Sequence, residues 1–135
     1  MSHPKMFADE DPFLHRVREI ALTFPGAQEK VSHGRPTFFT TKIFVHFGGS
    51  EKVDGEWVRH DRCILVLPDV AEREPLLGDE RCYSPAYLGA YGWVGFQLPP
   101  LRAPKRDWAE VTELIDESYR NTAGKRLVAQ LDDGT

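Results

Sequence analysis

The stretch from Lys30 to Leu67 constrains the fold most, because β-branched and aromatic residues dominate it and turn residues interrupt it. This composition predicts a group of strands near residues 30–33, 37–41 and 42–47. Gly48-Gly49-Ser50 then begins a polar loop that contains Asp54-Gly55, a strong hairpin signal, before the apolar run from Cys63. We therefore expect a long antiparallel hairpin with an exposed tip.

Apolar residues recur at helical spacing both before and after this strand-rich region, and each of the two patterns predicts a helix. Asp11 and Pro12 suit a helix start, with Asp11 as the cap, and apolar residues then recur at helical spacing until Pro25-Gly26: Phe13, Val17, Ile20, Ala21 and Phe24. A second stripe predicts a helix near residues 107–122, with Asp107 and Glu110 at capping-box spacing: Trp108, Val111, Ile115, Ser118 and Tyr119. We expect the Ser118 hydroxyl to bond back to a carbonyl one turn earlier in its own helix.

Three weaker signals complete the element order. Asp69 suits the cap of a short helix that Pro75 limits, Trp93 to Leu98 alternates as a strand, and Leu127 to Leu131 suggests a last turn or two. The resulting order of helix, strands, short helix, strand and helix is typical of an α+β fold. A single antiparallel sheet packed against N- and C-terminal helices is therefore the expected architecture.

Length and composition narrow the class of protein. A chain of 135 residues fits a single domain over 1–135, and its two cysteines form no CxxC pair and predict no disulfide framework. The chain has no apolar stretch long enough to span a bilayer and no signal-peptide pattern near Met1, so we expect a soluble, cytoplasmic protein without membrane association. The net charge of −4 means that any phosphate contact must come from a local basic patch.

Motifs for metal, cofactor or catalytic chemistry are absent from the sequence. His33, His46 and His60 lie far apart and form no HxH, HExxH or Cys-His pattern, so we expect no metal. There is no phosphate-binding glycine loop and no GxSxG elbow, and adjacent residues Ser32 and His33 would point to opposite faces of a strand. We therefore expect no cofactor and no enzymatic activity.

Aromatic residues crowd the segment from Tyr83 to Trp93, which also contains Tyr87 and Tyr91. Aromatic rings beside basic residues can stack on nucleic-acid bases. They can equally cover one end of a small sheet, and the sequence leaves both alternatives open.

Several short motifs together carry a resemblance to a known family. They are Phe24-Pro25-Gly26-Ala27, His33-Gly34-Arg35-Pro36-Thr37-Phe38, Lys42-Ile43-Phe44, Tyr83-Ser84-Pro85-Ala86-Tyr87-Leu88-Gly89, Gly92-Trp93-Val94 and Ser118-Tyr119. In type and order they resemble the MmcQ/YjbR-like family over a core of roughly residues 12–128. The family-motif residues in this chain are His33, Gly34, Pro36, Phe38, Lys42, Phe44, Pro85, Tyr87, Trp93, Ser118 and Tyr119.

This resemblance implies a CyaY-like α+β fold with a double-wing arrangement of hairpins. It also implies DNA binding through a concave sheet surface and hairpin wings, which is itself an analogy between folds. No reaction or cofactor accompanies the resemblance. The related iron-binding frataxin group lines its first helix with carboxylates, but here Arg16 and Arg18 interrupt the acidic residues, so we expect no iron site.

The leading hypothesis is a non-enzymatic DNA-binding protein that binds through sheet-face and wing residues. Its candidate phosphate ligands are Arg35, Lys42, Arg59 and Arg62, and its candidate stacking residues are Tyr91 and Trp93. Binding through such cations would weaken steeply with added salt. The alternative is a protein- or small-ligand-interaction domain with no nucleic-acid role, and an enzyme is the third choice.

Overall fold

The computed structural model describes residues 4–134, so residues 1–3 and 135 of the expected domain lie outside the described part. In chain order the elements are α1 (Pro12–Ala21), β1 (Gln28–Ser32), β2 (Arg35–Phe39), β3 (Ile43–Val53), β4 (Glu56–Val66), α2 (Val70–Leu77), β5 (Cys82–Tyr83), the 3₁₀ turn η1 (Leu88–Tyr91), β6 (Val94–Gln97), α3 (Lys105–Thr122) and α4 (Lys125–Asp133). The α+β architecture with an antiparallel sheet and flanking N- and C-terminal helices is confirmed.

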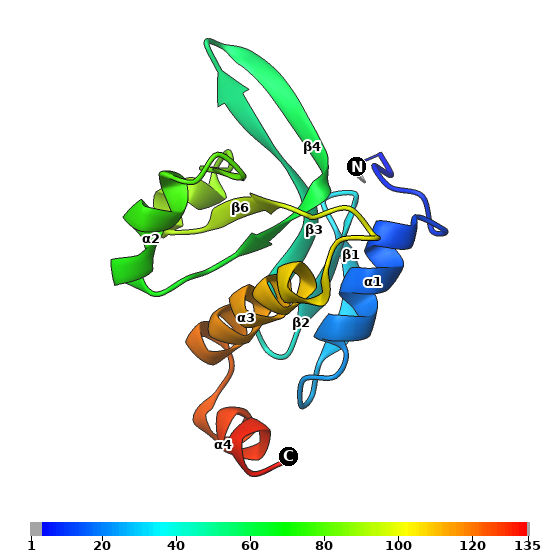
Figure 1. The fold of residues 1–135 in the computed structure, drawn as a ribbon, viewed down its shortest axis with the longest axis vertical. Coiled ribbons are helices and arrows are strands. Elements are labelled where there is room, and N and C mark those ends of the chain that lie inside the picture. Colours follow the sequence, from blue (N-terminus) through cyan, green and yellow to red (C-terminus); the bar gives the residue numbers. More distant parts are fainter. Residues whose placement is uncertain (1–3, 135) are drawn as a thin grey trace.

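The strands form one sheet in the order β1-β2-β3-β4-β6-β5, and every neighbouring pair is antiparallel. Helices α1 and α3 pack on one face of this sheet, whereas α2 lies beside β5 and β6 (Figure 1). The β3–β4 hairpin extends well beyond the other strands, and α4 lies at the opposite end of the molecule (Figure 1). The described residues contain no helix that is both long and apolar enough to cross a membrane.

The β3–β4 hairpin confirms the turn predicted at Asp54-Gly55 but not the loop predicted from Gly48. Both turn residues have positive φ, 51° and 84°, which is the conformation that Asp-Gly favours between two twisted strands. The polar residues before the turn continue β3 as far as Val53, and Val53 pairs with Glu56. The loop prediction was wrong because cross-strand pairing, which does not require apolar side chains, extends through this polar segment.

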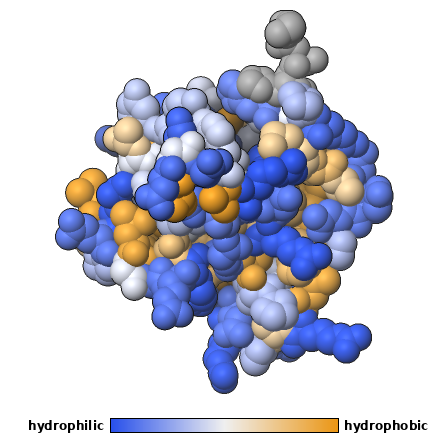
Figure 2. All heavy atoms as spheres, turned by 90° about the horizontal axis from the view of Figure 1, so that it is seen from above, coloured by the Kyte–Doolittle hydropathy of each residue, from blue (hydrophilic) through white to orange (hydrophobic). Residues whose placement is uncertain are grey.

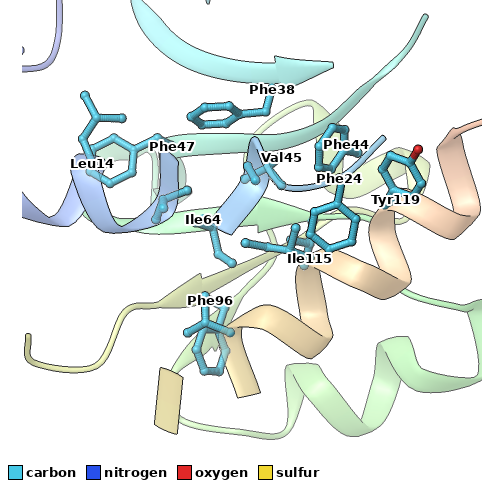
Figure 3. Close-up of a cluster of buried hydrophobic side chains, with 14 of the residues drawn as sticks. Leu14, Phe24, Phe38, Phe44, Val45, Phe47, Ile64, Phe96, Ile115 and Tyr119 are labelled. Atoms are coloured by element: carbon cyan, nitrogen blue, oxygen red, sulfur yellow. The ribbon is translucent and has the colours of Figure 1, made fainter. Parts of the chain in front are cut away.

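A β-bulge at Phe44 shapes the core. Phe38 pairs with Val45 and Phe39 pairs with Ile43, so β3 carries one extra residue there. The Phe44 side chain is fully buried between Phe24 and Tyr119, with ring centroids 5.9 Å and 5.1 Å away (Figure 3). The bulge thus directs an aromatic side chain from the sheet toward the helices.

Ser118 and Tyr119 join α3 to distant backbone. The Ser118 hydroxyl donates to the Phe44 carbonyl at 2.6 Å and accepts from the Leu67 amide at 2.8 Å. The expected bond within its own helix was therefore wrong, because the bulged strand and the end of β4 supply the partners. The Tyr119 hydroxyl donates to the Pro25 carbonyl at 2.6 Å. These bonds fix α3 against both the sheet and the turn between α1 and β1.

Helix boundaries differ from the sequence expectations in specific ways. The Asp11 carboxylate accepts from the Phe13 amide at 2.8 Å, as expected for a cap. Helix α3 instead begins after Pro104, so Asp107 lies in the first turn and does not cap it. Asp69 stands at the α2 N-cap without a side-chain bond to the helix. The two-residue strand β5 was not predicted, because two residues give no periodicity.

Candidate functional site

The sheet face opposite α1 and α3 carries aromatic and polar side chains. The Tyr83 ring lies directly on Gly95, where a Cβ atom would overlap the ring. Its hydroxyl is 3.1 Å from the Cys63 sulfur. Burial raises the pKa of the Cys63 thiol to about 12, so this sulfur stays protonated at neutral pH and is a poor nucleophile.

His60 connects this face to the base of the hairpin. Its ring stacks on Tyr83 with centroids 4.1 Å apart, and its Nδ1 lies 2.6 Å from the Gln97 amide nitrogen. Because that amide donates to Nδ1, the remaining Nε2–H donates to the Glu51 carboxylate, 2.7 Å away. His60 thus links Glu51 of β3, Gln97 of β6 and Tyr83 of β5, and these contacts hold the base of the hairpin in place.

His46 faces Trp93 on the same side of the sheet, with ring centroids 5.2 Å apart in an edge-to-face arrangement. Burial, together with the nearby His33, lowers the His46 pKa to about 4. The unfolded chain therefore binds a proton at this residue between about pH 6.5 and 4 while the folded chain does not. Stability should fall as the pH drops through this window.

We expect the free energy of unfolding to decrease by about 2 kcal/mol from neutral pH to about pH 4.5 through His46 alone. Urea titrations at both pH values measure it, and His46→Gln should remove that part of the decrease. The matched control His15→Gln, on the surface of α1, should leave the pH dependence unchanged. An equal decrease in His46→Gln and the unaltered chain would contradict the assignment.

The four candidate phosphate ligands do not lie on one surface. The Arg35 side chain is buried, with its guanidinium 3.2 Å from the Asp61 carboxylate and donating to the Gly49 carbonyl at 3.4 Å. Arg59 is exposed but lies 3.1 Å from the same Asp61 oxygen. One carboxylate therefore compensates both arginines, and Arg35 is inaccessible to a phosphate.

Lys42 and Arg62 occupy other parts of the molecule. Lys42 is exposed in the turn between β2 and β3. Arg62 lies on the helix side of β4, with its guanidinium 4.7 Å from the centre of the Phe13 ring of α1. Within residues 4–134 no hydrogen bond or ion pair joins the side chain of Lys42 or Arg62 to the Arg35–Asp61–Arg59 group.

The two candidate stacking residues differ in accessibility. Trp93 is half-buried against His46, whereas Tyr91 is 79% exposed at the end of η1. Viewed from the hairpin end of the molecule, hydrophobic residues form separate patches among hydrophilic ones (Figure 2). Of the two residues, Tyr91 has the exposed ring that stacking on a base requires.

Trp57 and Tyr87 form an exposed aromatic pair, and they are the site residues that the sequence did not single out as a pair. Trp57 on β4 is 53% exposed and Tyr87 is 79% exposed, with ring centroids 6.0 Å apart and planes inclined by 33°. The Lys52 ammonium of β3 lies 5.4 Å from the Trp57 ring centre. We call Lys52, Trp57 and Tyr87 the aromatic hairpin surface.

The backbone at Tyr87 is strained. Its φ of 65° and ψ of −58° describe a γ-turn with positive φ, closed by the Leu88 amide donating to the Ala86 carbonyl at 2.7 Å. The Ala86 amide in turn donates to the Ser50 carbonyl of β3 at 2.9 Å. Such strain persists only where the surroundings enforce it and is concentrated at functional sites. The fold therefore holds an exposed tyrosine beside Trp57 at an energetic cost.

A sequence signal for this pair is weak. Tyr87 belongs to the aromatic segment that the sequence identified, but nothing there indicates a γ-turn. Trp57 follows the Asp54-Gly55 turn closely, but tryptophan is highly buried on average, so the sequence does not indicate an exposed ring there. The pairing of the two rings depends on the Ser50–Ala86 contact between distant segments.

The family-motif residues serve mainly the fold. Phe38, Phe44, Ser118 and Tyr119 are buried in or beside the core, and His33 and Gly34 form the β1–β2 turn with positive φ. Pro36 is buried in β2, and Pro85 is buried two residues before Tyr87. Among the large hydrophobic residues of this set, Tyr87 is the one with an exposed side chain, at 79%.

Comparison with known proteins gives one clear result. The model of the YjbR family matches residues 22–121, which is more than half of the chain. No curated protein matches it. The resemblance seen in the sequence motifs is thus confirmed, and the chain belongs to the YjbR family.

Proposed function

We propose that this chain is a non-enzymatic domain that binds single-stranded nucleic acid through the aromatic hairpin surface. The observation that carries the proposal is the exposed Trp57–Tyr87 pair with the Lys52 ammonium beside it. Exposed aromatic rings stack on bases with little sequence preference, and each stacked base contributes about 1–3 kcal/mol. A lysine beside the rings supplies a cation for the adjoining phosphate.

Single strands suit this surface better than a duplex. The bases of a duplex stack on one another, so binding to it depends on cations that reach the phosphates. On the hairpin Asp61 compensates Arg35 and Arg59, and Glu51, Asp54 and Glu56 add negative charge. Stacking should therefore dominate, and the steep salt dependence expected from four phosphate-binding cations should be replaced by a shallow one.

Fluorescence anisotropy of a labelled oligothymidylate and of a mixed-sequence duplex tests the proposal. We expect saturable binding of the oligothymidylate, weaker binding of the duplex, and a salt slope that corresponds to about one or two phosphate contacts. Trp57→Ala should raise the Kd about 5- to 150-fold, and Trp57→Phe should retain most of the affinity.

The matched control is Val70→Ala, which removes another exposed apolar side chain, 93% exposed on α2, away from the hairpin. It should bind as the unaltered chain does. Circular dichroism of each variant excludes unfolding as the cause of a loss. Equal affinity of Trp57→Ala and the unaltered chain, or preferential binding of the duplex, would contradict the proposal.

A protein-interaction domain is the second candidate. Val53 and Val58 on the hairpin are 44% and 38% exposed, which gives the hairpin apolar as well as aromatic surface. Tryptophan and tyrosine are enriched among residues that dominate protein interfaces. Failure of both DNA probes to bind at low salt would favour this candidate.

A further inference from the structure

A hollow of about 360 Å³ lies on the helix side of the molecule, away from the residues of the aromatic hairpin surface. We call it the arginine hollow, and its lining consists of Phe13, Arg62, Leu98, Pro100, Leu101 and Arg102. The apolar residues come from α1 and the segment that precedes α3, whereas Arg62 comes from β4. Its volume falls within the range of small-molecule sites, roughly 300–1,000 Å³.

The segment from Leu98 to Pro104 is fixed before any ligand binds. The Leu98 amide donates to the Arg62 carbonyl at 2.9 Å, which attaches the segment to β4. The Pro100 carbonyl accepts from the Ala103 amide at 3.0 Å and from the Trp108 indole at 3.1 Å. Prolines at 99, 100 and 104 restrict the backbone further. This side of the hollow is therefore already in place before a ligand binds.

The positive charges of the two arginines that line the hollow are not compensated by an ion pair in the described residues. Within residues 4–134 neither Arg62 nor Arg102 takes part in an ion pair. Arg62 stacks over the Phe13 ring, an arrangement that leaves the N–H groups at the edge of its planar guanidinium able to donate. The Asp11 carboxylate, at the N-cap of α1, accepts from the Phe13 amide and makes no ion pair with either arginine.

We propose that the arginine hollow binds a small organic carboxylate with an apolar body. The guanidinium fork of Arg62 matches the two oxygens of a carboxylate, and Arg102 adds a second cation. The apolar body would cover Leu98, which is half-buried, and Leu101, which is 36% exposed. This site is independent of the aromatic hairpin surface and adds a ligand class to the proposed function.

Nuclear magnetic resonance titration with 4-phenylbutyrate tests the site, with the uncharged 4-phenylbutyramide as its matched probe. Amide signals of Phe13 and of residues 98–103 should shift saturably with the carboxylate. The amide probe should bind at least about tenfold more weakly, because hydrogen bonds to a charged acceptor are the stronger ones. Arg62→Gln and Arg102→Gln should each weaken phenylbutyrate binding by about tenfold or more.

Three variants keep the test specific. Lys105→Gln removes an exposed cation of the neighbouring α3 turn that does not line the hollow, and it should bind phenylbutyrate normally. Arg62→Lys keeps the charge without the fork and should lie between Arg62→Gln and the unaltered chain. Trp57→Ala should bind phenylbutyrate normally, whatever its effect on nucleic acid. Equal binding of both probes, signal shifts elsewhere, or unchanged binding by Arg62→Gln would overturn the proposal.

Discussion

Replacing Phe44 with alanine should lower the free energy of unfolding by about 3–5 kcal/mol, a large part of the stability of a domain of this size. Phe44 is fully buried at the bulge of β3, and its ring contacts Phe24 and Tyr119. The smaller side chain leaves a cavity that the bulged strand cannot close by sliding, because Ser118 holds its carbonyl. Urea denaturation followed by circular dichroism measures the change.

The matched control for this prediction is Leu22→Ala. Leu22 follows α1 and is 42% exposed, so its truncation should change the free energy of unfolding by no more than about 0.5 kcal/mol. A loss below about 1 kcal/mol in Phe44→Ala would mean that the aromatic cluster does not organise the core.

Ser118→Ala should also destabilise the fold strongly, although it removes a single oxygen atom. The fully buried hydroxyl connects the Phe44 carbonyl to the Leu67 amide, two backbone groups that no regular strand pairing satisfies. Each buried group left without a partner costs about 1–3 kcal/mol. Thermal and urea denaturation should therefore both show a loss comparable to that of a truncated core side chain.

Thr112→Ala provides the comparison on the same helix. Thr112 is exposed, and its hydroxyl donates to the Trp108 carbonyl of α3 itself at 3.1 Å, so its removal leaves no distant group unpaired. Its stability should stay within about 0.5 kcal/mol of the unaltered chain. An equal change in the free energy of unfolding in Ser118→Ala and Thr112→Ala would show that the Ser118 hydroxyl does not bridge β3 and the segment after β4.

The sequence predicted those parts of the fold that local patterns determine. The apolar spacing from Phe13 to Ala21 predicted the buried face of α1, and Asp54-Gly55 predicted the hairpin turn. Both follow from interactions over a few residues, where side-chain spacing and turn preferences decide the conformation. The α+β class followed from the order of such segments.

Features that depend on distant segments could not be predicted in this way. The partners of Ser118 lie on β3 and just after β4, and the extension of β3 through Gly49 depends on pairing with His60. Arg35 was a candidate phosphate ligand because, in a chain of net charge −4, any phosphate contact had to come from a local basic patch. Its burial against Asp61 arises only when β4 lies beside β3.

The candidate site was predicted in part. The aromatic segment that contains Tyr87 was identified, but its partner Trp57 was missed because their contact joins the hairpin to a turn thirty residues later. Family membership is shown by the match over residues 22–121, and it leaves the binding partner to experiment.

The most direct test of nucleic-acid binding uses the indole N–H signals of the three tryptophans during titration with oligothymidylate. The Trp57 signal should shift and broaden, because its exposed ring stacks on a base. The Trp108 signal should stay in place, because its indole is buried and donates to the Pro100 carbonyl. A stationary Trp57 signal at saturating oligothymidylate would contradict the account.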